Sequence, residues 1–193
     1  MSVTMWFDPT CPFTWRTSRW LRTEARARGE KVTWRLMSLA VLNEARDVPD
    51  QYREGQQAGV RVLRVLAAAA ELHGNDAVEA LYTELGIRVH DRGGRYDTGT
   101  IADAVTAAAL PAGLAGAADD PARDAAVRAS HEEGQARAGQ ESGSPLTAFG
   151  DSAGFFGPIL TAVPAGEDAA RLYDSMAALS TITAFSELKR ART

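Results

Sequence analysis

The sequence predicts an α/β fold that carries a large, all-helical insertion, and three patterns support this prediction. The first 38 residues are patterned as strand, helix and strand, a βαβ unit whose crossover is normally right-handed. From about residue 50 to 139 the pattern is helical and Ala-rich, without a convincing strand. β-Prone segments return at residue 145 and are followed by helical sequence. We therefore expect one domain built from residues 1–49 and 140–193, interrupted by a helical domain over 50–139.

The first strand and the first helix are the best-defined elements. Residues 3–7 form an apolar, β-prone run that is typical of a buried strand. Thr10 is expected to cap the next helix, over 13–28, because a threonine hydroxyl can accept a hydrogen bond from the first free N–H groups. Pro12 falls in the first turn of that helix, where a missing N–H group costs little.

The remaining elements are assigned from hydrophobic periodicity and from breaks at Gly and Pro. A second strand is expected over 32–38, and a hairpin over 145–149 and 155–163 with its turn at 150–154. Helices are expected near 51–72, 75–85, 98–110, 121–138, 166–178 and 180–191.

Composition and charge exclude several classes of protein. The 193-residue chain is 45% hydrophobic and 24% charged, as globular domains are. Its net charge of −4 argues against a nucleic-acid partner. No run of about 18 apolar residues predicts a membrane span. The N-terminal residues do not resemble a signal peptide, so we expect a cytoplasmic protein.

Cys11 is the only cysteine, so neither an internal disulfide nor a multi-cysteine metal site is expected. A lone cysteine is often a small, buried apolar residue. Here it stands at the N-terminal end of the first helix, where free N–H groups and the helix dipole favour a thiolate. Cys11 is therefore predicted to be a reactive nucleophile.

Four arginines follow on the same helix at spacings of three and four residues, which places them along one stripe. They are Arg16, Arg19, Arg22 and Arg26. Two interpretations stay open: a solvated charged face, or a positive potential that Arg16 and Arg19 add near the thiol. Trp15 and Trp20 are expected to face the core.

Several catalytic patterns are present only in part. Residues 150–154 spell G-x-S-x-G, but they lie between predicted strands and no histidine follows, so a hydrolase is not indicated. The three histidines, His73, His90 and His131, lack zinc-ligand spacing, so no metal is expected. No P-loop or G-x-G-x-x-G occurs, so no tightly bound nucleotide is expected, although the use of a flavin or deazaflavin stays open.

Four short motifs carry a resemblance to a known family. They are D-P-x-C-P at 8–12, S-L-A-V-L-N-E at 38–44, L-G-I-R-V-H at 85–90 and G-F-F-G-P at 154–158. Together they resemble the actinobacterial mycothiol-dependent nitroreductases, within the DsbA-like thioredoxin-fold oxidoreductases. The resemblance implies a thioredoxin fold with a helical insertion, a redox-active cysteine at the tip of the first helix, and mycothiol as thiol co-substrate.

The resemblance also implies roles for individual residues around Cys11. Ser144–Pro145 matches the family's cis-proline, which faces the reactive sulfur; a trans proline that opens an edge strand is the alternative. Further substrate-binding candidates are Pro12 of the motif, Asn43 and Tyr52 at the pocket border, Phe13 in place of a pocket tryptophan, and His90 as a proton donor above the cleft. The last four also have a plain structural interpretation, as cap, packing or surface residues.

Thr14 departs from the C-x-x-C motif of relatives that cycle an internal disulfide. A mixed disulfide on Cys11 then has no second protein thiol to resolve it, so a free thiol such as mycothiol must do so in a monothiol cycle. The Thr14 hydroxyl is expected either to hydrogen-bond the sulfur or to bond back to its own helix.

The leading hypothesis is an oxidoreductase that uses Cys11 to reduce disulfides or small electrophiles of nitro type. Its partners would be a low-molecular-weight thiol and that small molecule, and the sequence leaves a homodimer open. The first alternative is an enzyme similar to kappa-class glutathione transferases or chromene-carboxylate isomerases, in which the residue at the helix tip activates a bound thiol. The second alternative is a non-catalytic thioredoxin-like binding module.

Overall fold

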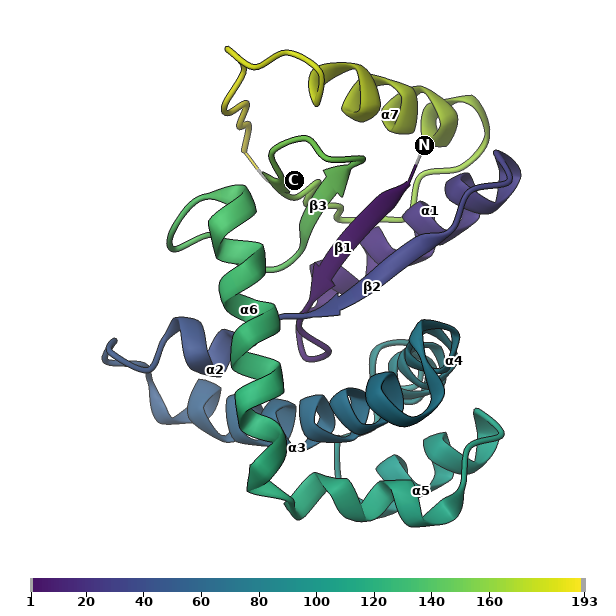
Figure 1. Ribbon diagram of the computed structural model, residues 1–193, viewed down its shortest axis with the longest axis vertical. Helices are drawn as coiled ribbons and strands as arrows, with labels where there is room; N and C mark the ends of the chain where they lie inside the picture. The colour runs from purple at the N-terminus through teal and green to yellow at the C-terminus, as the bar shows by residue number, and fades with distance from the viewer. Residues whose placement is uncertain (1, 192–193) are drawn as a thin grey trace.

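The protein is built on a four-stranded mixed sheet (Figure 1). The structure is a computed structural model that describes residues 2–191, and for Gln51 only the backbone. The strands are β1 (Val3–Phe7), β2 (Val32–Leu36), β3 (Leu146–Phe149) and β4 (Phe155–Phe156), in the order β2-β1-β3-β4. β1 pairs in parallel with β2 and antiparallel with β3. Strands from both ends of the chain therefore meet at β1.

Helix α1 (Pro12–Ala27) connects the two parallel strands, as expected of a βαβ unit. Its N-cap residue is Cys11, whose side chain makes no capping hydrogen bond. The prediction of Thr10 as the cap is wrong, because its backbone N–H and its hydroxyl both donate to the carboxylate of Asp8, at 2.8 and 2.6 Å. A charged acceptor outside the helix competes successfully for the Thr10 side chain.

The segment between β2 and β3 is mainly helical, as predicted. It contains α2 (Leu39–Leu42), α3 (Asp50–His73), α4 (Asn75–Gly86), the π-helix η1 (Ile87–Asp91), α5 (Thr98–Ala107), the 3₁₀ segments η2 (Ala112–Asp119) and η3 (Pro121–Arg123), and α6 (Asp124–Ala138). The four predicted helices all form, although α5 ends before residue 110 and η3 precedes α6. The sequence did not indicate α2, η1 or η2, because single turns and irregular helices have little periodic signal.

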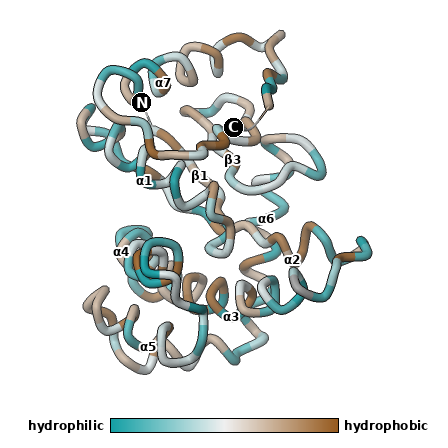
Figure 2. Tube along the Cα trace, turned by 180° about the vertical axis from the view of Figure 1, so that it is seen from behind, coloured by the Kyte–Doolittle hydropathy of each residue, from teal (hydrophilic) through white to brown (hydrophobic). Residues whose placement is uncertain are grey.

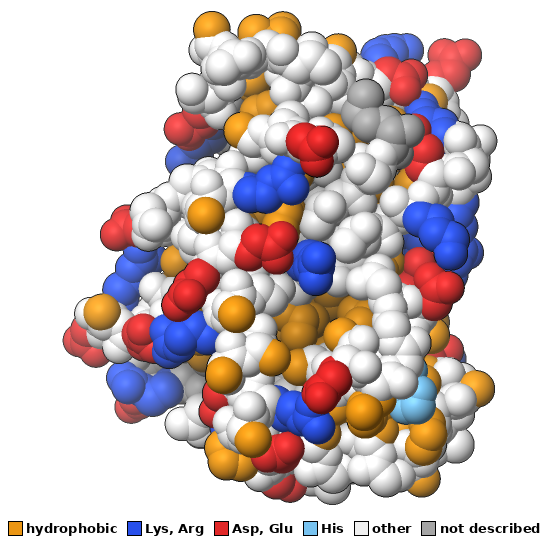
Figure 3. Space-filling view, in the orientation of Figure 1, with side chains coloured by type: hydrophobic (Ala, Val, Ile, Leu, Met, Phe, Trp, Pro, Cys, Tyr) orange, Lys and Arg blue, Asp and Glu red, His pale blue; other side chains and the backbone are white. Residues whose placement is uncertain are grey.

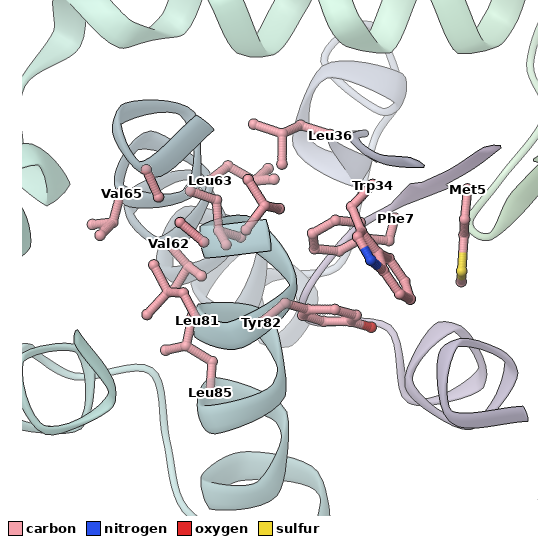
Figure 4. Packing of buried hydrophobic residues seen from close by; sticks show 14 of the residues in the cluster. Met5, Phe7, Trp34, Leu36, Val62, Leu63, Val65, Leu81, Tyr82 and Leu85 are labelled. Atoms are coloured by element: carbon pink, nitrogen blue, oxygen red, sulfur yellow. The ribbon is translucent and has the colours of Figure 1, made fainter. Parts of the chain in front are cut away.

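One apolar core joins the sheet to these helices. The rings of Phe7 on β1 and Tyr82 on α4 stack with centroids 4.0 Å apart, and Trp34 of β2 packs beside them (Figure 4). Trp15 and Trp20 of α1 are buried in the same core, which confirms that they face inward. Hydrophobic stretches of α3 lie among the surrounding helices (Figure 2). The core residues come from both predicted domains, so the two domains share one hydrophobic core.

Helix α6 crosses the sheet and packs on it (Figure 1). Gly134 permits this close approach, because a Cβ atom there would lie 2.9 Å from Trp6 Cδ1 and 3.0 Å from Leu146 Cδ1. Trp6 and Leu146 belong to a second, smaller buried cluster. The domain boundaries at residues 50 and 139 stay a prediction, and α6, which was assigned to the insertion, contacts the strands directly.

Strand β4 is much shorter than the predicted strand over 155–163. It ends at Phe156, because Gly157 adopts a φ of +114° and turns the chain away from the extended conformation. Pro158 then lacks the N–H group that further pairing with β3 would require. The prediction of the second hairpin strand over 155–163 is therefore wrong beyond its first two residues.

The last predicted helix, over 180–191, does not form. Helix α7 (Gly166–Leu179) forms as predicted and ends before it. The hydroxyls of Ser180 and Thr181 bond back to carbonyls of the last turn of α7, at 2.7 and 2.8 Å. Such side-chain bonds compete with helix continuation, and β-branched residues such as Ile182 propagate a helix poorly.

The surface carries mixed charge. Basic side chains lie interspersed with acidic ones on the face shown in Figure 3. Several form exposed ion pairs, such as Arg128 with Glu44 at 2.7 Å, and solvent screens such pairs so that they contribute little to stability. None of the helices among residues 2–191 combines the length and the apolar character that crossing a bilayer requires.

Candidate active site

Cys11 lies where β1 leads into α1, beside the start of β3. Its side chain is 9% exposed, and its thiol donates to the backbone carbonyl of Ser144 at an Sγ–O distance of 3.4 Å. The backbone N–H of Cys11 donates to the carbonyl of Asp8 at 3.2 Å, which fixes the turn before the helix. The sulfur is thus held between the positive end of α1 and the residue that precedes Pro145.

Ser144 connects Cys11 to two other residues of the site. The Ser144–Pro145 peptide is cis, as the resemblance implies, so the trans alternative is wrong. The hydroxyls of Ser144 and Thr14 are hydrogen-bonded at 2.8 Å, and the Ser144 hydroxyl oxygen accepts the backbone N–H of Asp8 at 2.9 Å. In the part of the chain described, Thr14 therefore pairs with Ser144, and not with the sulfur or with its own helix.

Asp8 is a buried carboxylate that appears in the sequence only as the first residue of the D-P-x-C-P motif. It is 2% exposed. One carboxylate oxygen accepts the two hydrogen bonds from Thr10, and the other accepts the backbone N–H of Leu39 at 2.7 Å. Burial raises the pKa of Asp8, and the hydrogen bonds from Leu39 and Thr10 oppose that rise. Asp8 thereby joins the loop that carries Cys11 to the first residue of α2.

We expect Asp8→Asn to destabilise the protein by about 1–3 kcal/mol, because an amide cannot accept all the hydrogen bonds and leaves a buried donor unpaired. The contribution of Asp8 to the stability of the wild type should also shrink as the pH rises. A carboxyl group whose pKa is raised by folding favours the folded state most while it is protonated.

Urea unfolding of both proteins from about pH 4 to about pH 8 measures this effect. The stability advantage of the wild type over Asp8→Asn should shrink with rising pH. An advantage that grows with pH would show that the Asp8 carboxylate is favoured, and not penalised, by its surroundings.

The π-helix η1 and the loop after it bring two polar groups to the loop that carries Cys11. His90 Nε2 lies 2.8 Å from the carbonyl oxygen of Pro9, and the Tyr96 hydroxyl donates to the same oxygen at 2.6 Å. The His90 ring also stacks with Trp15, with centroids 5.9 Å apart. Nothing in the local sequence of Tyr96 indicates this contact. His90 lies beside the site, its Nε2 bonds the loop, and its role as a proton donor stays a prediction.

Burial lowers the pKa of His90, so that the ring is neutral at pH 7 and donates its Nε2 proton to Pro9. Stability should therefore fall as the pH drops below about 6.5, because the unfolded chain binds a proton more readily than the folded one. His90→Gln keeps an N–H donor and should make this dependence shallower. It should not remove it, since burial also lowers the pKa of His131. Urea unfolding measures the slope, and an unchanged slope in His90→Gln would contradict this account.

The arginine stripe of α1 connects this helix to α4. Arg22 and Arg26 both contact Glu79 at 2.6 Å. The guanidinium of Arg19 lies over the Trp15 ring at 4.1 Å and donates to a threonine hydroxyl of α4 at 2.9 Å. The interpretation as a solvated face is therefore wrong for Arg19 and Arg22, which are half-buried between the two helices.

The remaining predicted substrate-binding residues belong to α1, α2 and α3. Pro12 and Phe13 are on the first turn of α1. Asn43 is the C-cap residue of α2, the helix whose first N–H binds Asp8. Tyr52 lies on the first turn of α3 and is 59% exposed, and no contact among the described residues joins it to the Cys11 site. The substrate-binding roles of these residues stay predictions.

A cleft of about 500 Å³ opens beside α1. It is lined by Pro12, Trp15, Arg16, Arg19, His90, Asp91 and residues 161–163. The lining comes from the helix that follows Cys11, from η1, and from the loop before α7. Residues 2–191 contain no group of three or more His, Cys, Asp or Glu side chains placed to hold a metal ion.

The chain matches known proteins along nearly its whole length. The model of the Rv2466c-like family, described as "Mycothiol-dependent nitroreductase Rv2466c", matches residues 10–190. The uncharacterized protein Rv2286c of Mycobacterium tuberculosis (strain ATCC 25618 / H37Rv) is 29% identical over 197 residues. That match covers 99% of this chain and 82% of the relative.

Two solved structures are similar to this one. The probable DsbA oxidoreductase SCO1869 from Streptomyces coelicolor superposes with a TM-score of 0.62 at 20% identity, covering 99% of this chain and 94% of that one. A 2-hydroxychromene-2-carboxylate isomerase superposes with a TM-score of 0.65 at 15% identity, covering 94% and 95%. At these identities the likeness shows the fold alone, and it confirms a DsbA-like thioredoxin fold.

The fold, the thiol at the tip of α1 and the family match together define the class as thiol-dependent oxidoreductases. Within that class, the chain belongs to the Rv2466c-like family of mycothiol-dependent nitroreductases, because the family model spans residues 10–190. The family resemblance found in the sequence is thereby confirmed. The mycobacterial relative agrees with the actinobacterial origin that it implies.

Proposed function

We propose that this protein reduces disulfides or small nitro-type electrophiles in a monothiol cycle, with Cys11 as nucleophile and mycothiol as reductant. One observation carries the proposal: the only thiol of the chain lies at the N-terminus of α1, with its sulfur 3.4 Å from the carbonyl of Ser144. A helix N-terminus stabilises negative charge, so the sulfur is placed to react as a thiolate. Membership of the family supports the choice of mycothiol.

The surrounding residues hold this sulfur in place. When the thiol loses its proton, its bond to the Ser144 carbonyl is released and the sulfur becomes free to attack. The hydroxyl pair of Thr14 and Ser144 fixes the distance between α1 and the start of β3. Asp8 and His90 anchor the preceding loop from two sides, through Thr10 and through the Pro9 carbonyl. These are positioning roles, and the covalent chemistry belongs to Cys11.

With a disulfide substrate, the Cys11 thiolate attacks one sulfur, a new S–S bond forms, and the other half leaves as a thiolate. A mycothiol thiolate then attacks the substrate sulfur of this mixed disulfide. The Cys11 thiolate is restored, and the substrate half departs as its disulfide with mycothiol. No second protein thiol is required, which agrees with Thr14 at the position of the second cysteine.

With a nitro compound, each two-electron step oxidises two mycothiol thiols to one mycothiol disulfide. The nitro group becomes a nitroso group, and one water molecule is released. The stoichiometry therefore distinguishes this reaction from simple thiol exchange, in which no net oxidation of mycothiol to its symmetric disulfide is needed.

The test supplies the purified protein with mycothiol and, in separate reactions, with nitrobenzene derivatives or bis(2-hydroxyethyl) disulfide. Mass spectrometry quantifies the mycothiol products. We expect many turnovers per protein with at least one of these substrates, and with a nitro compound one mycothiol disulfide per nitroso product. Failure to consume any of them beyond the protein-free rate would overturn the proposal.

A further inference from the structure

The cleft beside α1 is adjacent to Cys11 in the fold. Two of its lining residues, Pro12 and Trp15, lie on the first turn of α1, which Cys11 caps. The backbone N–H of Trp15 donates to the backbone carbonyl of Cys11 at 3.1 Å. A third, His90, bonds the carbonyl of Pro9 in the loop just before Cys11. The cleft therefore borders the first turns of α1 and contacts, through His90, the loop that carries Cys11, although Cys11 itself is not among its lining residues.

The cleft carries more positive than negative charge. It contains the guanidinium groups of Arg16 and Arg19 and the single carboxylate of Asp91. Asp91 already accepts a hydrogen bond from Trp15 Nε1, at 2.8 Å. This excess of positive charge in the cleft contrasts with the net charge of −4 of the whole chain.

Neither arginine of the cleft is neutralised by an acid of its own. Within residues 2–191 no carboxylate lies within ion-pairing distance of Arg16, whose guanidinium lies 5.8 Å from the centre of the Phe13 ring. The Nη2 atom of Arg19 is buried and has no hydrogen-bond partner among the described residues. Unpaired guanidinium donors favour an anionic acceptor with two oxygens, such as a carboxylate.

The lining of the cleft also includes apolar side chains. Pro12, Trp15, Ala162 and Val163 contribute them, beside the polar side chains of Thr161 and His90. Such a mixed surface fits a small organic molecule. The combination of apolar side chains with one unpaired cationic side is typical of a site for a small organic anion.

We infer that this cleft selects a carboxylate on the small molecule that reacts at Cys11, with Arg16 as its main contact. The inference rests on the proposed function and narrows its substrate class. Mycothiol, the proposed thiol partner, carries no carboxylate, so the carboxylate belongs to the electrophile. The two arms of the test below use an alkylating electrophile and a disulfide electrophile. Arg16 is the residue to change, because it is half-buried on the cleft, whereas Arg19 also supports the packing of α1 on α4.

The first arm compares iodoacetate with iodoacetamide, two alkylating reagents of similar size that differ in charge. In both reactions the Cys11 thiolate attacks the methylene carbon, a C–S bond forms, and iodide leaves. Intact mass measured over time gives both rates, and their ratio cancels any change in the ionisation of Cys11. The ratio of iodoacetate to iodoacetamide rates should be at least about threefold higher in the wild type than in Arg16→Gln. This difference should weaken in about 0.5 M NaCl.

The matched control is Arg171→Gln, on the exposed face of α7, where the arginine pairs, among the described residues, with Glu167 and Asp168 of its own helix. It also removes one positive charge from the protein, and it should keep the wild-type ratio. Equal ratios in Arg16→Gln and Arg171→Gln would show that Arg16 does not select a carboxylate on an alkylating electrophile.

The second arm compares the rates at which Cys11 forms a mixed disulfide with glutathione disulfide and with its tetraethyl ester, which keeps the two amino groups and has no carboxylate. A preference for the acid that Arg16→Gln abolishes would show that the cleft also selects a carboxylate on a disulfide electrophile. The absence of an Arg16-dependent preference in both arms would overturn the inference. Because neither arm measures turnover, this result is distinguishable from a failure of the proposed reductase activity.

Discussion

Replacing Cys11 by serine is expected to abolish thiol-dependent reduction, lowering the rate by at least about a thousandfold. A hydroxyl cannot form the mixed disulfide on which the cycle depends, and it is hardly ionised near neutral pH. The change is otherwise small, because serine can also donate to the Ser144 carbonyl that the thiol contacts. The folded protein should therefore persist, and the loss should be confined to chemistry.

This substitution also separates the proposed cycle from the isomerase and transferase alternative. If the residue at the helix tip only activates a bound thiol, serine should retain activity. Thr23→Ser is a suitable control, since Thr23 lies exposed on the same helix and its hydroxyl bond to the Arg19 carbonyl can be kept by serine. Reduction by Cys11→Ser at a rate near that of Thr23→Ser would contradict nucleophilic catalysis by Cys11.

Gly86→Ala should destabilise the protein by about 3 kcal/mol, the largest structural effect we expect from adding one methyl group. An ideal Cβ at Gly86 would lie 2.1, 2.3 and 2.6 Å from three ring carbons of Trp15. The Trp15 ring cannot move without cost, because its Nε1 donates to Asp91 and Arg19 lies over its face. His90 stacks on the same ring, so the displacement would reach the loop that carries Cys11.

Urea unfolding compares Gly86→Ala with Gly55→Ala, a second glycine-to-alanine change inside a helix. A Cβ at Gly55 would meet nothing within 4 Å, so that substitution should stabilise α3 by about 0.5–1 kcal/mol. Gly86→Ala should also slow the alkylation of Cys11, because the cleft and the loop shift together. Equal stability changes for the two variants would show that α4 and α1 are not packed as described.

Single helices and strands of this protein could be predicted from the sequence, because short stretches of neighbouring residues determine them. The run over 3–7, the proline at position 12 and the cysteine between them define the strand-to-helix junction without any distant contact. The helical character of 51–72 follows from its periodicity, and α3 (Asp50–His73) confirms it. The helix expected over 180–191 does not form, because the hydroxyls of Ser180 and Thr181 bond back to α7 and Leu188 stays exposed instead of packing on the core.

The partners of the site could not be predicted, because they are far apart along the chain. Thr14 bonds a hydroxyl 130 residues away, and Tyr96 bonds a carbonyl 87 residues away. The motif at 8–12 contains Asp8 but does not indicate its partner, because the N–H group of Leu39 that binds its carboxylate belongs to a one-turn helix without periodic signal. The likeness to a known family supplied Ser144 and His90 as candidates, whereas Asp8 and Tyr96 emerge only from the packed structure.

The most direct test of the central claim is the intact mass of the protein after exposure to mycothiol disulfide, with Cys11→Ser treated in parallel. The account predicts one adduct with the mass of a single mycothiol, which disappears on addition of reduced mycothiol and never forms on the serine variant. If Cys11 stays unmodified by mycothiol disulfide and is still alkylated by iodoacetamide, the thiol is accessible but does not enter the disulfide cycle, and the proposed function is contradicted.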